Sequence, residues 1–207
     1  MRIATFNING IKARLPRLLE WLEETQPDVA CLQEIKTMDD GFPAEDFTKI
    51  GYEAIWHGQK SFNGVAILAK GTKPVEIQRG LGIDGPKEGE GEQARYLEAD
   101  VRGVRICNLY LPNGNPHPGP KFDYKLSWME RIIWSNLSEG SKTFFFLDFD
   151  HRNDQRYNRY SNFASKPACH LWYDQYCTVH SGGMGLWKMF AKNKINYSSS
   201  DRIPCYF

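Results

Sequence analysis

Residues 29–36 read Val29-Ala30-Cys31-Leu32-Gln33-Glu34-Ile35-Lys36, four apolar residues followed directly by polar and charged ones. A short apolar run without polar alternation is typical of a β-strand that is buried on both faces. A carboxylate at the end of such a strand is costly unless it is paired, solvated or bound to a cation. The segment therefore predicts a buried strand that carries Glu34 to the edge of a sheet.

The residues before this strand predict a β-α-β unit. Residues 2–6 form a short apolar run that ends in Asn7-Ile8-Asn9-Gly10, as a strand does when it stops in a polar turn. Leucines at positions 15, 18, 19 and 22 recur at helical spacing, with Pro16 placed in the first turn of the expected helix. Strand, helix and strand in succession favour a layered α/β fold.

Strand-like and helical patterns continue after this unit. We expect strands at residues 52–57, 64–69, 95–101, 104–111 and 143–149, a hairpin tip at 100–103, a surface loop at 80–91 and a helix at 122–133.

The composition is that of an ordinary globular protein. The chain has 207 residues, 41% hydrophobic residues and a formal net charge of +1, which excludes a surface that is basic throughout but not a local basic groove. Polar residues interrupt every apolar stretch before it could span a membrane or act as a signal segment, so we expect no membrane partner. Five cysteines, an odd number, favour free thiols and a cytoplasmic location.

The chain changes character near residue 132. Residues 1–132 hold 12 aromatic residues and 27 leucines, isoleucines and valines. Residues 133–207 hold 16 aromatic residues but only 8 leucines, isoleucines and valines. No sustained helical or strand periodicity continues after residue 160. We therefore expect a domain over residues 1–150 and a divergent tail, irregular or poorly packed, over residues 151–207.

Polar groups end several of the predicted strands, which is where functional groups gather in layered α/β folds. Glu34 suits a hard cation such as Mg²⁺. Asn7 offers an amide oxygen to a metal or an amide hydrogen to a phosphate, and Tyr110 offers a phenol that can donate to a phosphate oxygen. Taken singly, each also has a structural explanation: Glu34 as an acid at a helix start, Asn7 as a turn residue and Tyr110 as a core aromatic residue.

Four segments stand together in one order: residues 7–10 (NING), 32–36 (LQEIK), 62–67 (FNGVAI) and 108–115 (NLYLPNGN). In combination they resemble the exodeoxyribonuclease III family, within the endonuclease/exonuclease/phosphatase superfamily. The resemblance runs from Met1 to about Ile132. It implies an α/β fold, a four-layered α/β sandwich with two central β-sheets, here incomplete at the C-terminus.

The resemblance also implies a function. Family members hydrolyse phosphodiester bonds of double-stranded DNA with Mg²⁺, or alternatively Mn²⁺, cutting 5′ to abasic sites and removing nucleotides from 3′ ends. A monomer is expected. By matching motif, Glu34 and Asn7 form the expected metal site, and Tyr110 holds the scissile phosphate. The residues expected on the DNA side are Asn9, Lys36 and Asn113.

Two motifs of this family are altered in the second half of the chain. The family carries Gly-Asp-x-Asn, whose Asp acts on the attacking water and whose Asn helps to orient it. Residues 145–150 read FFLDFD instead, so Asp148 and Asp150 are the candidate counterparts. The family also ends in Ser-Asp-His, where this chain has Ser200-Asp201-Arg202, and an arginine cannot replace histidine as a base.

Three functions remain open from the sequence. The first is an active nuclease that uses Glu34, Asn7, Tyr110 and Asp148. The second is a catalytically inactive remnant, truncated or frameshifted after Ile132, that at most binds DNA; the other two reading frames of the coding DNA would test it. The third, a phosphatase of small phosphoesters, is disfavoured by residues 108–115.

Overall fold

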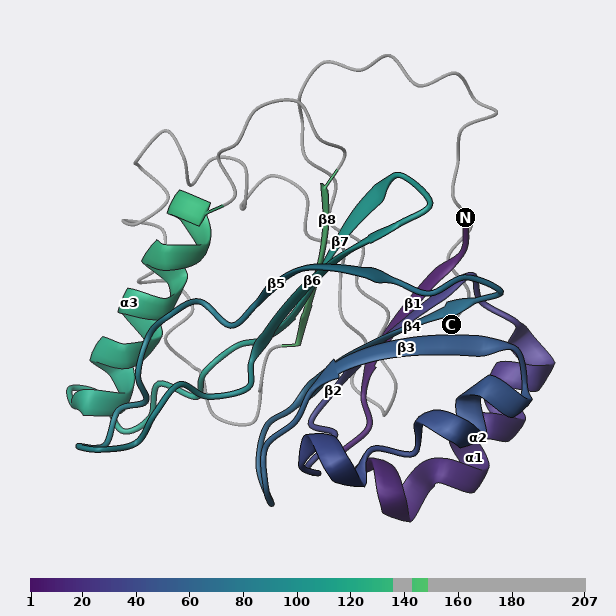
Figure 1. Cartoon of the computed structure of the whole chain (residues 1–207). Coiled ribbons are helices and arrows are strands. Elements are labelled where there is room, and N and C mark those ends of the chain that lie inside the picture. The colour runs from purple at the N-terminus through teal and green to yellow at the C-terminus, as the bar shows by residue number, and fades with distance from the viewer. Residues whose placement is uncertain (136–142, 149–207) are drawn as a thin grey trace.

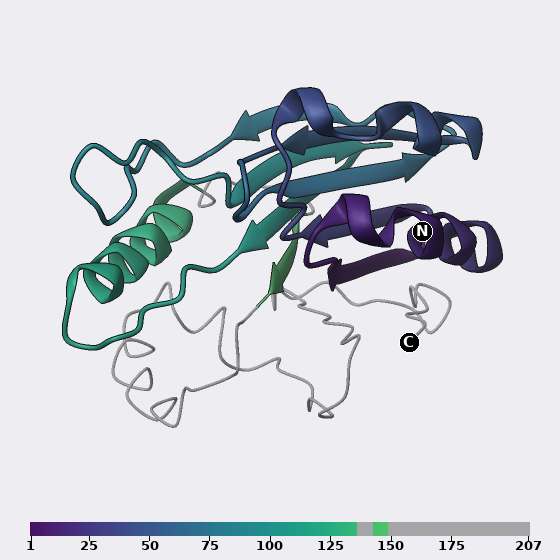
Figure 2. The same ribbon diagram turned by 90° about the horizontal axis from the view of Figure 1, so that it is seen from below.

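The computed structural model describes residues 1–135 and 143–148 of the chain. In this part, two four-stranded β-sheets pack face to face. Helices cover the outer face of each sheet, and Figures 1 and 2 show them on opposite sides of the molecule. The predicted α/β sandwich of four layers around two central sheets is confirmed.

Sheet A has the strand order β1 (Ile3–Asn7), β2 (Val29–Gln33), β4 (Val65–Lys70) and β3 (Tyr52–His57). β1 and β2 are parallel, with Asn7 opposite Gln33, and the other two pairs are antiparallel. β2 is buried along its whole length, as predicted. Because parallel strands end at the same edge of a sheet, Asn7 and the residue after Gln33 lie close together.

Two helices and a short 3₁₀ helix, η1 (Asp39–Gly41), accompany sheet A. α1 (Ile11–Thr25) and α2 (Ala44–Lys49) pack on its outer face. α1 begins before the leucine pattern does, so Pro16 lies in its second turn and not in the first turn as expected. The early start is fixed by the loop after β2, where the Gly10 and Ile11 N–H groups donate to Glu34 O at 2.7 Å and Ile35 O at 3.0 Å.

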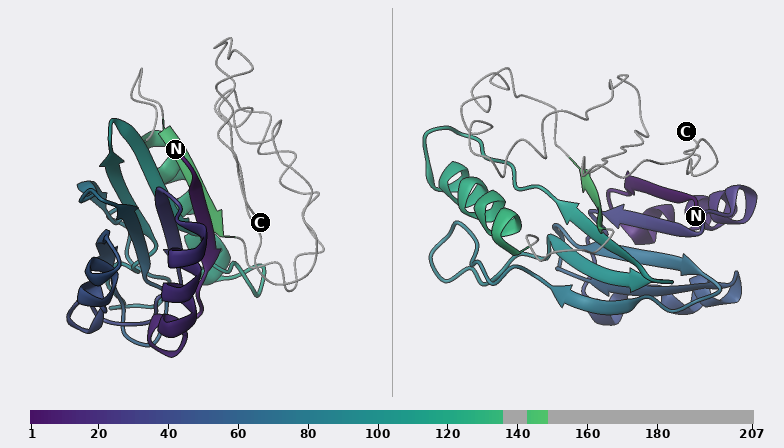
Figure 3. Two further views of the ribbon diagram at one scale, coloured as in Figure 1. Left: turned by 90° about the vertical axis from the view of Figure 1, so that its right-hand side faces the viewer. Right: turned by 90° about the horizontal axis from the view of Figure 1, so that it is seen from above.

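Sheet B has the order β5 (Val75–Arg79), β6 (Tyr96–Val101), β7 (Val104–Tyr110) and β8 (Thr143–Asp148). β7 and β8 are parallel, and β8 lies beside β7 in Figure 3. α3 (Pro120–Ser135) covers the outer face of this sheet.

Side chains alternate between the two faces of each strand, which divides the core into layers. Leu97 and Ala99 of β6 point into the space between the sheets, whereas Tyr96 packs against Tyr124 and Trp128 of α3. Cys31 and Cys107 are buried free thiols, as predicted, and burial raises the pKa of both.

β5 and α2 were not predicted from the sequence. β5 is an edge strand, and its apolar side chains Val75 and Ile77 are 64% and 44% exposed, so no burial pattern marks it. α2 has only six residues, too few for a clear helical period. The strand predicted near residue 143 is confirmed as β8. Asp150, the expected tail at 151–207 and Ser200–Arg202 lie outside the described residues.

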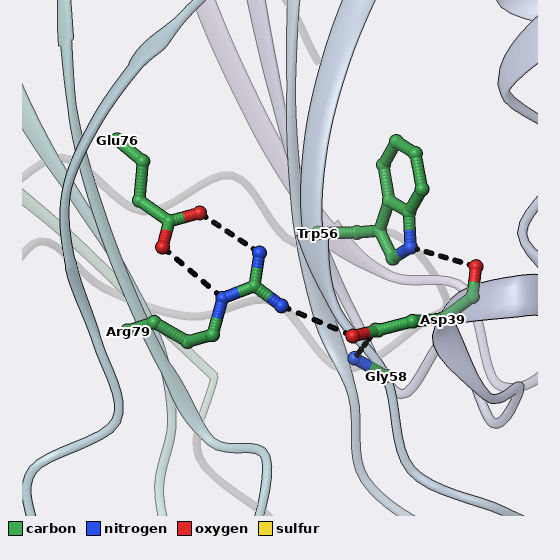
Figure 4. Close-up of polar contacts among 5 residues, drawn as sticks. All are labelled: Asp39, Trp56, Gly58, Glu76 and Arg79. Carbon is green, nitrogen blue, oxygen red and sulfur yellow. Dashed lines mark hydrogen bonds and ion pairs between the residues drawn. The ribbon is translucent and has the colours of Figure 1, made fainter.

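Arg79 joins the edge of sheet B to a loop of sheet A (Figure 4). Its guanidinium donates to Glu76 Oε2 at 2.8 Å and to Asp39 Oδ2 of η1 at 3.1 Å. Asp39 also accepts from Gly58 N at 2.6 Å and, through its backbone carbonyl, from Trp56 Nε1 at 3.0 Å. These ion pairs are exposed, so each contributes about 0–1 kcal/mol. Within residues 1–135, no helix is both long and apolar enough to cross a membrane.

Candidate active site

Glu34 is the centre of a group of polar side chains at the edge where β1, β2 and β7 end. Its Oε1 accepts hydrogen bonds from Asn7 Nδ2 at 2.8 Å and from the Tyr110 hydroxyl at 2.7 Å. Its Oε2 pairs with Lys36 Nζ at 2.7 Å. Three residues therefore converge on one carboxylate: Asn7 at the end of β1, Lys36 in the loop after β2, and Tyr110 at the end of β7.

The backbone around this carboxylate is strained. Glu34, Lys36, Asn9 and Asn63 have φ values of +55°, +51°, +47° and +50°, in the left-handed region. A residue such as Glu34 or Lys36 costs about 1–2 kcal/mol in this conformation, whereas asparagine adopts it more readily. Hydrogen bonds hold the segment there, from Lys36 N to Asn63 O at 3.0 Å and from Ile35 N to Gly64 O at 3.1 Å. Strain of this kind clusters at catalytic and ligand-binding sites.

Asn7 and Asn9 form hydrogen bonds to each other and to the charged groups around Glu34. The Asn7 side-chain oxygen accepts from Asn9 N at 2.9 Å, which turns the Asn7 amide hydrogens toward Glu34. Lys36 Nζ donates to Asn9 Oδ1 as well as pairing with Glu34. Asn113, by contrast, is exposed in the loop after β7, and its side-chain oxygen accepts from Asn115 N at 3.1 Å.

The site keeps Glu34 ionised. Partial burial raises the pKa of its carboxyl, but hydrogen bonds from Lys36, Asn7 and Tyr110 outweigh burial and hold the pKa below its usual value of 4.5. One carboxylate with a neighbouring amide suits a hard cation that keeps most of its water, such as Mg²⁺. Among the described residues, no three His, Cys, Asp or Glu side chains gather as a zinc site requires.

The lowered pKa of Glu34 predicts a specific dependence of stability on pH. A carboxyl group whose pKa is lower in the folded state stabilises the fold above its usual pKa, and this contribution is lost as the pH falls through the folded-state pKa. We expect the Tm advantage of the wild type over Glu34→Gln to shrink as the pH falls from 7 to below 4.5. Thermal melts across this range measure it, and a constant difference would contradict the assignment.

Arg95 was not predicted as a site residue. Its guanidinium carbon lies 4.7 Å from the centre of the Tyr110 ring, and its Nη1 donates to the backbone oxygens of Tyr110 at 3.3 Å and Leu111 at 3.4 Å. The sequence did contain a signal. The predicted strands at 95–101 and 104–111 form a hairpin with a tip at 100–103, and this pairing brings Arg95 beside Tyr110.

A buried amide pair connects the two sheets directly beneath the site. Asn108 of β7 donates to Leu32 O at 2.9 Å and to Ala66 O at 2.8 Å, and it accepts from Gln33 Nε2 at 2.6 Å. Gln33 also donates to Thr5 Oγ1 at 2.9 Å. Gln33 and Asn108 are fully buried. Gln33 directly precedes Glu34 in the sequence, and Asn108 lies two residues before Tyr110. The pair thus fixes the distance between the two halves of the site.

The remaining candidates come from the second half of the chain. Asp148, the last residue of β8, is the register partner of Tyr110 in β7, which brings its backbone to the same edge of sheet B. Asp150 lies outside the described residues.

Comparison with known proteins places these features in a family. The sequence model of the Endonuclease/Exonuclease/phosphatase family matches residues 4–185, and so extends past Ile132. Exodeoxyribonuclease III of Haemophilus influenzae is 41% identical over 118 residues, which are 55% of this chain and 42% of that protein. The Exodeoxyribonuclease of Bacillus subtilis is 26% identical over 137 residues, 64% of this chain and 51% of that protein. The chain thus spans about half the length of these curated relatives.

Solved structures agree with this placement. The 3′-5′ exonuclease NExo from Neisseria meningitidis aligns with a TM-score of 0.63 and 34% identity, over 71% of this chain and 57% of that one. An AP endonuclease from Archaeoglobus fulgidus aligns with the same TM-score and identity, over 70% and 56%. With a family match over residues 4–185, this chain belongs to the endonuclease/exonuclease/phosphatase family.

Proposed function

We propose that the chain is a DNA-repair nuclease of the exodeoxyribonuclease III type, which hydrolyses phosphodiester bonds of double-stranded DNA with Mg²⁺ or Mn²⁺. The observation that carries the proposal is the convergence of Asn7, Lys36 and Tyr110 on the Glu34 carboxylate. The relatives that share this part of the sequence include an exodeoxyribonuclease III and the zebrafish DNA repair nuclease APEX1. Abasic sites and 3′ ends are the proposed substrates of a cytoplasmic monomer.

The residues present fit the proposed metal. Glu34 would hold the ion, with Asn7 beside it, and the ion would neutralise charge on the phosphate. Asn7 already orients Glu34 by donating to its Oε1 at 2.8 Å. The Tyr110 hydroxyl, which donates to the same oxygen, would hold a phosphate oxygen when DNA is bound.

The proposed DNA contacts are independent of sequence, because they go to the backbone. Lys36, 31% exposed at the site, would face the phosphates together with Asn9 and Asn113. Asp148 would act on the attacking water, and Asp150 would help to orient it. The register of Asp148 opposite Tyr110 supports the first of these two roles.

Incubation with a duplex that contains one abasic site tests the proposal. We expect a single cut on the 5′ side of the abasic site in Mg²⁺, no cut in EDTA, and recovery when Mg²⁺ or Mn²⁺ is restored. A duplex with a recessed 3′ end should release nucleotides under the same conditions. A protein that unfolds cooperatively but cuts neither duplex would favour the inactive remnant, and turnover of a small phosphoester alone would favour a phosphatase.

A further inference from the structure

We propose that Arg95 is a positioning residue of this site, which fixes the Tyr110 side chain and places a positive charge beside it. The part of this inference that concerns catalysis rests on the proposed function, whereas the part that concerns the position of Tyr110 does not.

Arg95 holds Tyr110 from several directions. Its guanidinium carbon is 4.7 Å from the centre of the phenol ring. Its Nη1 reaches Tyr110 O and Leu111 O at 3.3 and 3.4 Å, and its backbone oxygen accepts from Tyr110 N at 2.8 Å. The ring face, the carbonyl and the N–H of Tyr110 are therefore all in contact with one residue. These contacts fix the phenol whose hydroxyl lies 2.7 Å from Glu34.

The charge of Arg95 is the second observation. Among residues 1–132, whose side chains the structure describes, no carboxylate lies within ion-pair distance of Arg95, although the Glu34 carboxylate is near enough to favour its charged form. Arg79 and Arg105, by contrast, pair directly with Glu76 and Glu98 at 2.8 and 3.1 Å. The side chain that accepts a hydrogen bond from Arg95 Nε is neutral: it is Gln93, whose Oε1 lies at 2.5 Å. Burial lowers the pKa of Arg95, although a guanidinium stays charged in proteins.

A desolvated cation that no carboxylate of residues 1–132 pairs with directly is unfavourable in this part of the protein. It is favourable when an anion binds next to it, because the charges then compensate. The phosphodiester proposed to bind at Tyr110 is an anion of this kind. Arg95 therefore has two separable effects, a geometric one on Tyr110 and an electrostatic one on the phosphate.

Lysine and methionine separate these two effects. Arg95→Lys keeps the charge but loses the planar group that stacks on the ring and the fork that reaches two carbonyls. Arg95→Met keeps an unbranched apolar stem and loses both. Arg102→Met is the matched control, since Arg102 lies at the far end of the same hairpin. Its side chain is 47% exposed, and its Nη1 lies 3.6 Å from Asp28 Oδ1.

The geometric effect is tested on the full chain without DNA or metal. 3-Fluorotyrosine incorporated at position 110 reports the ring environment as one ¹⁹F resonance. We expect both Arg95 variants to shift or broaden this resonance, with Arg102→Met unchanged and a cooperative melt retained. If Arg95→Met does not fold, Arg95→Lys alone carries the test. A resonance that stays in place in a folded Arg95 variant would overturn the proposal.

Kinetics on the abasic duplex test both effects, because Arg95→Lys keeps the charge and Arg95→Met does not. Misplacement of a catalytic group by about 1 Å costs up to about 100-fold, so we expect Arg95→Lys to lower kcat by about ten- to a hundredfold with KM nearly unchanged. Arg95→Met should also raise KM. Equal kinetics in Arg95→Met and the wild type would overturn the inference. A wild type that cuts no DNA would overturn the proposed function and the catalytic part, while the ¹⁹F result would still decide the positioning of Tyr110.

Discussion

Replacing Glu34 by glutamine is expected to reduce metal-dependent cleavage of an abasic duplex by about a thousandfold or more. Glutamine keeps the shape of the side chain and an oxygen for the Tyr110 hydroxyl, but it carries no charge to hold Mg²⁺ or Lys36. A bound metal contributes several kcal/mol to the transition state, and about 1.4 kcal/mol corresponds to tenfold in rate. Single-turnover cleavage at saturating Mg²⁺ measures the effect.

Glu20→Gln is the matched control for this substitution. Glu20 is exposed on α1, where it pairs with Arg17 at 2.7 Å, and its neutralisation should leave the rate unchanged. Binding of Mn²⁺, followed by electron paramagnetic resonance, should weaken in Glu34→Gln and not in Glu20→Gln. A Glu34→Gln protein that cleaves within a few-fold of the wild type would show that Glu34 is not the metal ligand.

Replacing Asn108 by leucine is expected to destabilise the fold by roughly 3–5 kcal/mol, the largest stability effect among these predictions. Leucine fills a similar volume but leaves the carbonyl oxygens of Leu32 and Ala66 without their donor, and Gln33 Nε2 without one acceptor. Each buried polar group left unsatisfied costs about 1–3 kcal/mol. Urea unfolding should show a lower midpoint with an unchanged m-value.

Asn113→Leu provides the control, because it is the same change at an exposed position in the loop after β7. Surface substitutions of this kind usually change stability by less than about 0.5 kcal/mol. If Asn108→Leu unfolds at the same urea concentration as Asn113→Leu, the amide pair between the sheets contributes little to the fold.

The parts of the fold that local sequence predicts are those whose pattern matches their burial. Residues 29–32 of β2 are an unbroken apolar run and β2 is buried on both faces, so the pattern and the structure agree. β5 was missed because an edge strand with exposed Val75 and Ile77 has no burial to impose a pattern. The fold and the family could thus be predicted from a few strongly patterned segments, whereas the edge strand β5 could not.

The site divides in the same way. Glu34, Asn7 and Tyr110 were candidates because each was expected near a strand end, which is a local feature, and the resemblance of four short motifs to one family gave them their expected roles. Arg95 was not predicted, because a lone arginine at a strand start carries no signal of its own, and only the pairing of the two predicted hairpin strands relates it to Tyr110.

The sequence by itself determined the β-α-β unit, the buried strand at 29–32 and the residue types at the strand ends, because periodicity and turn chemistry act over a few neighbouring residues. Only the tertiary structure decided that the Tyr110 hydroxyl lies 2.7 Å from a carboxylate 76 residues earlier in the chain. It also decided that Asn108 of one sheet satisfies two carbonyls of the other. Contacts of this kind depend on how two sheets pack face to face, and no local pattern encodes that packing.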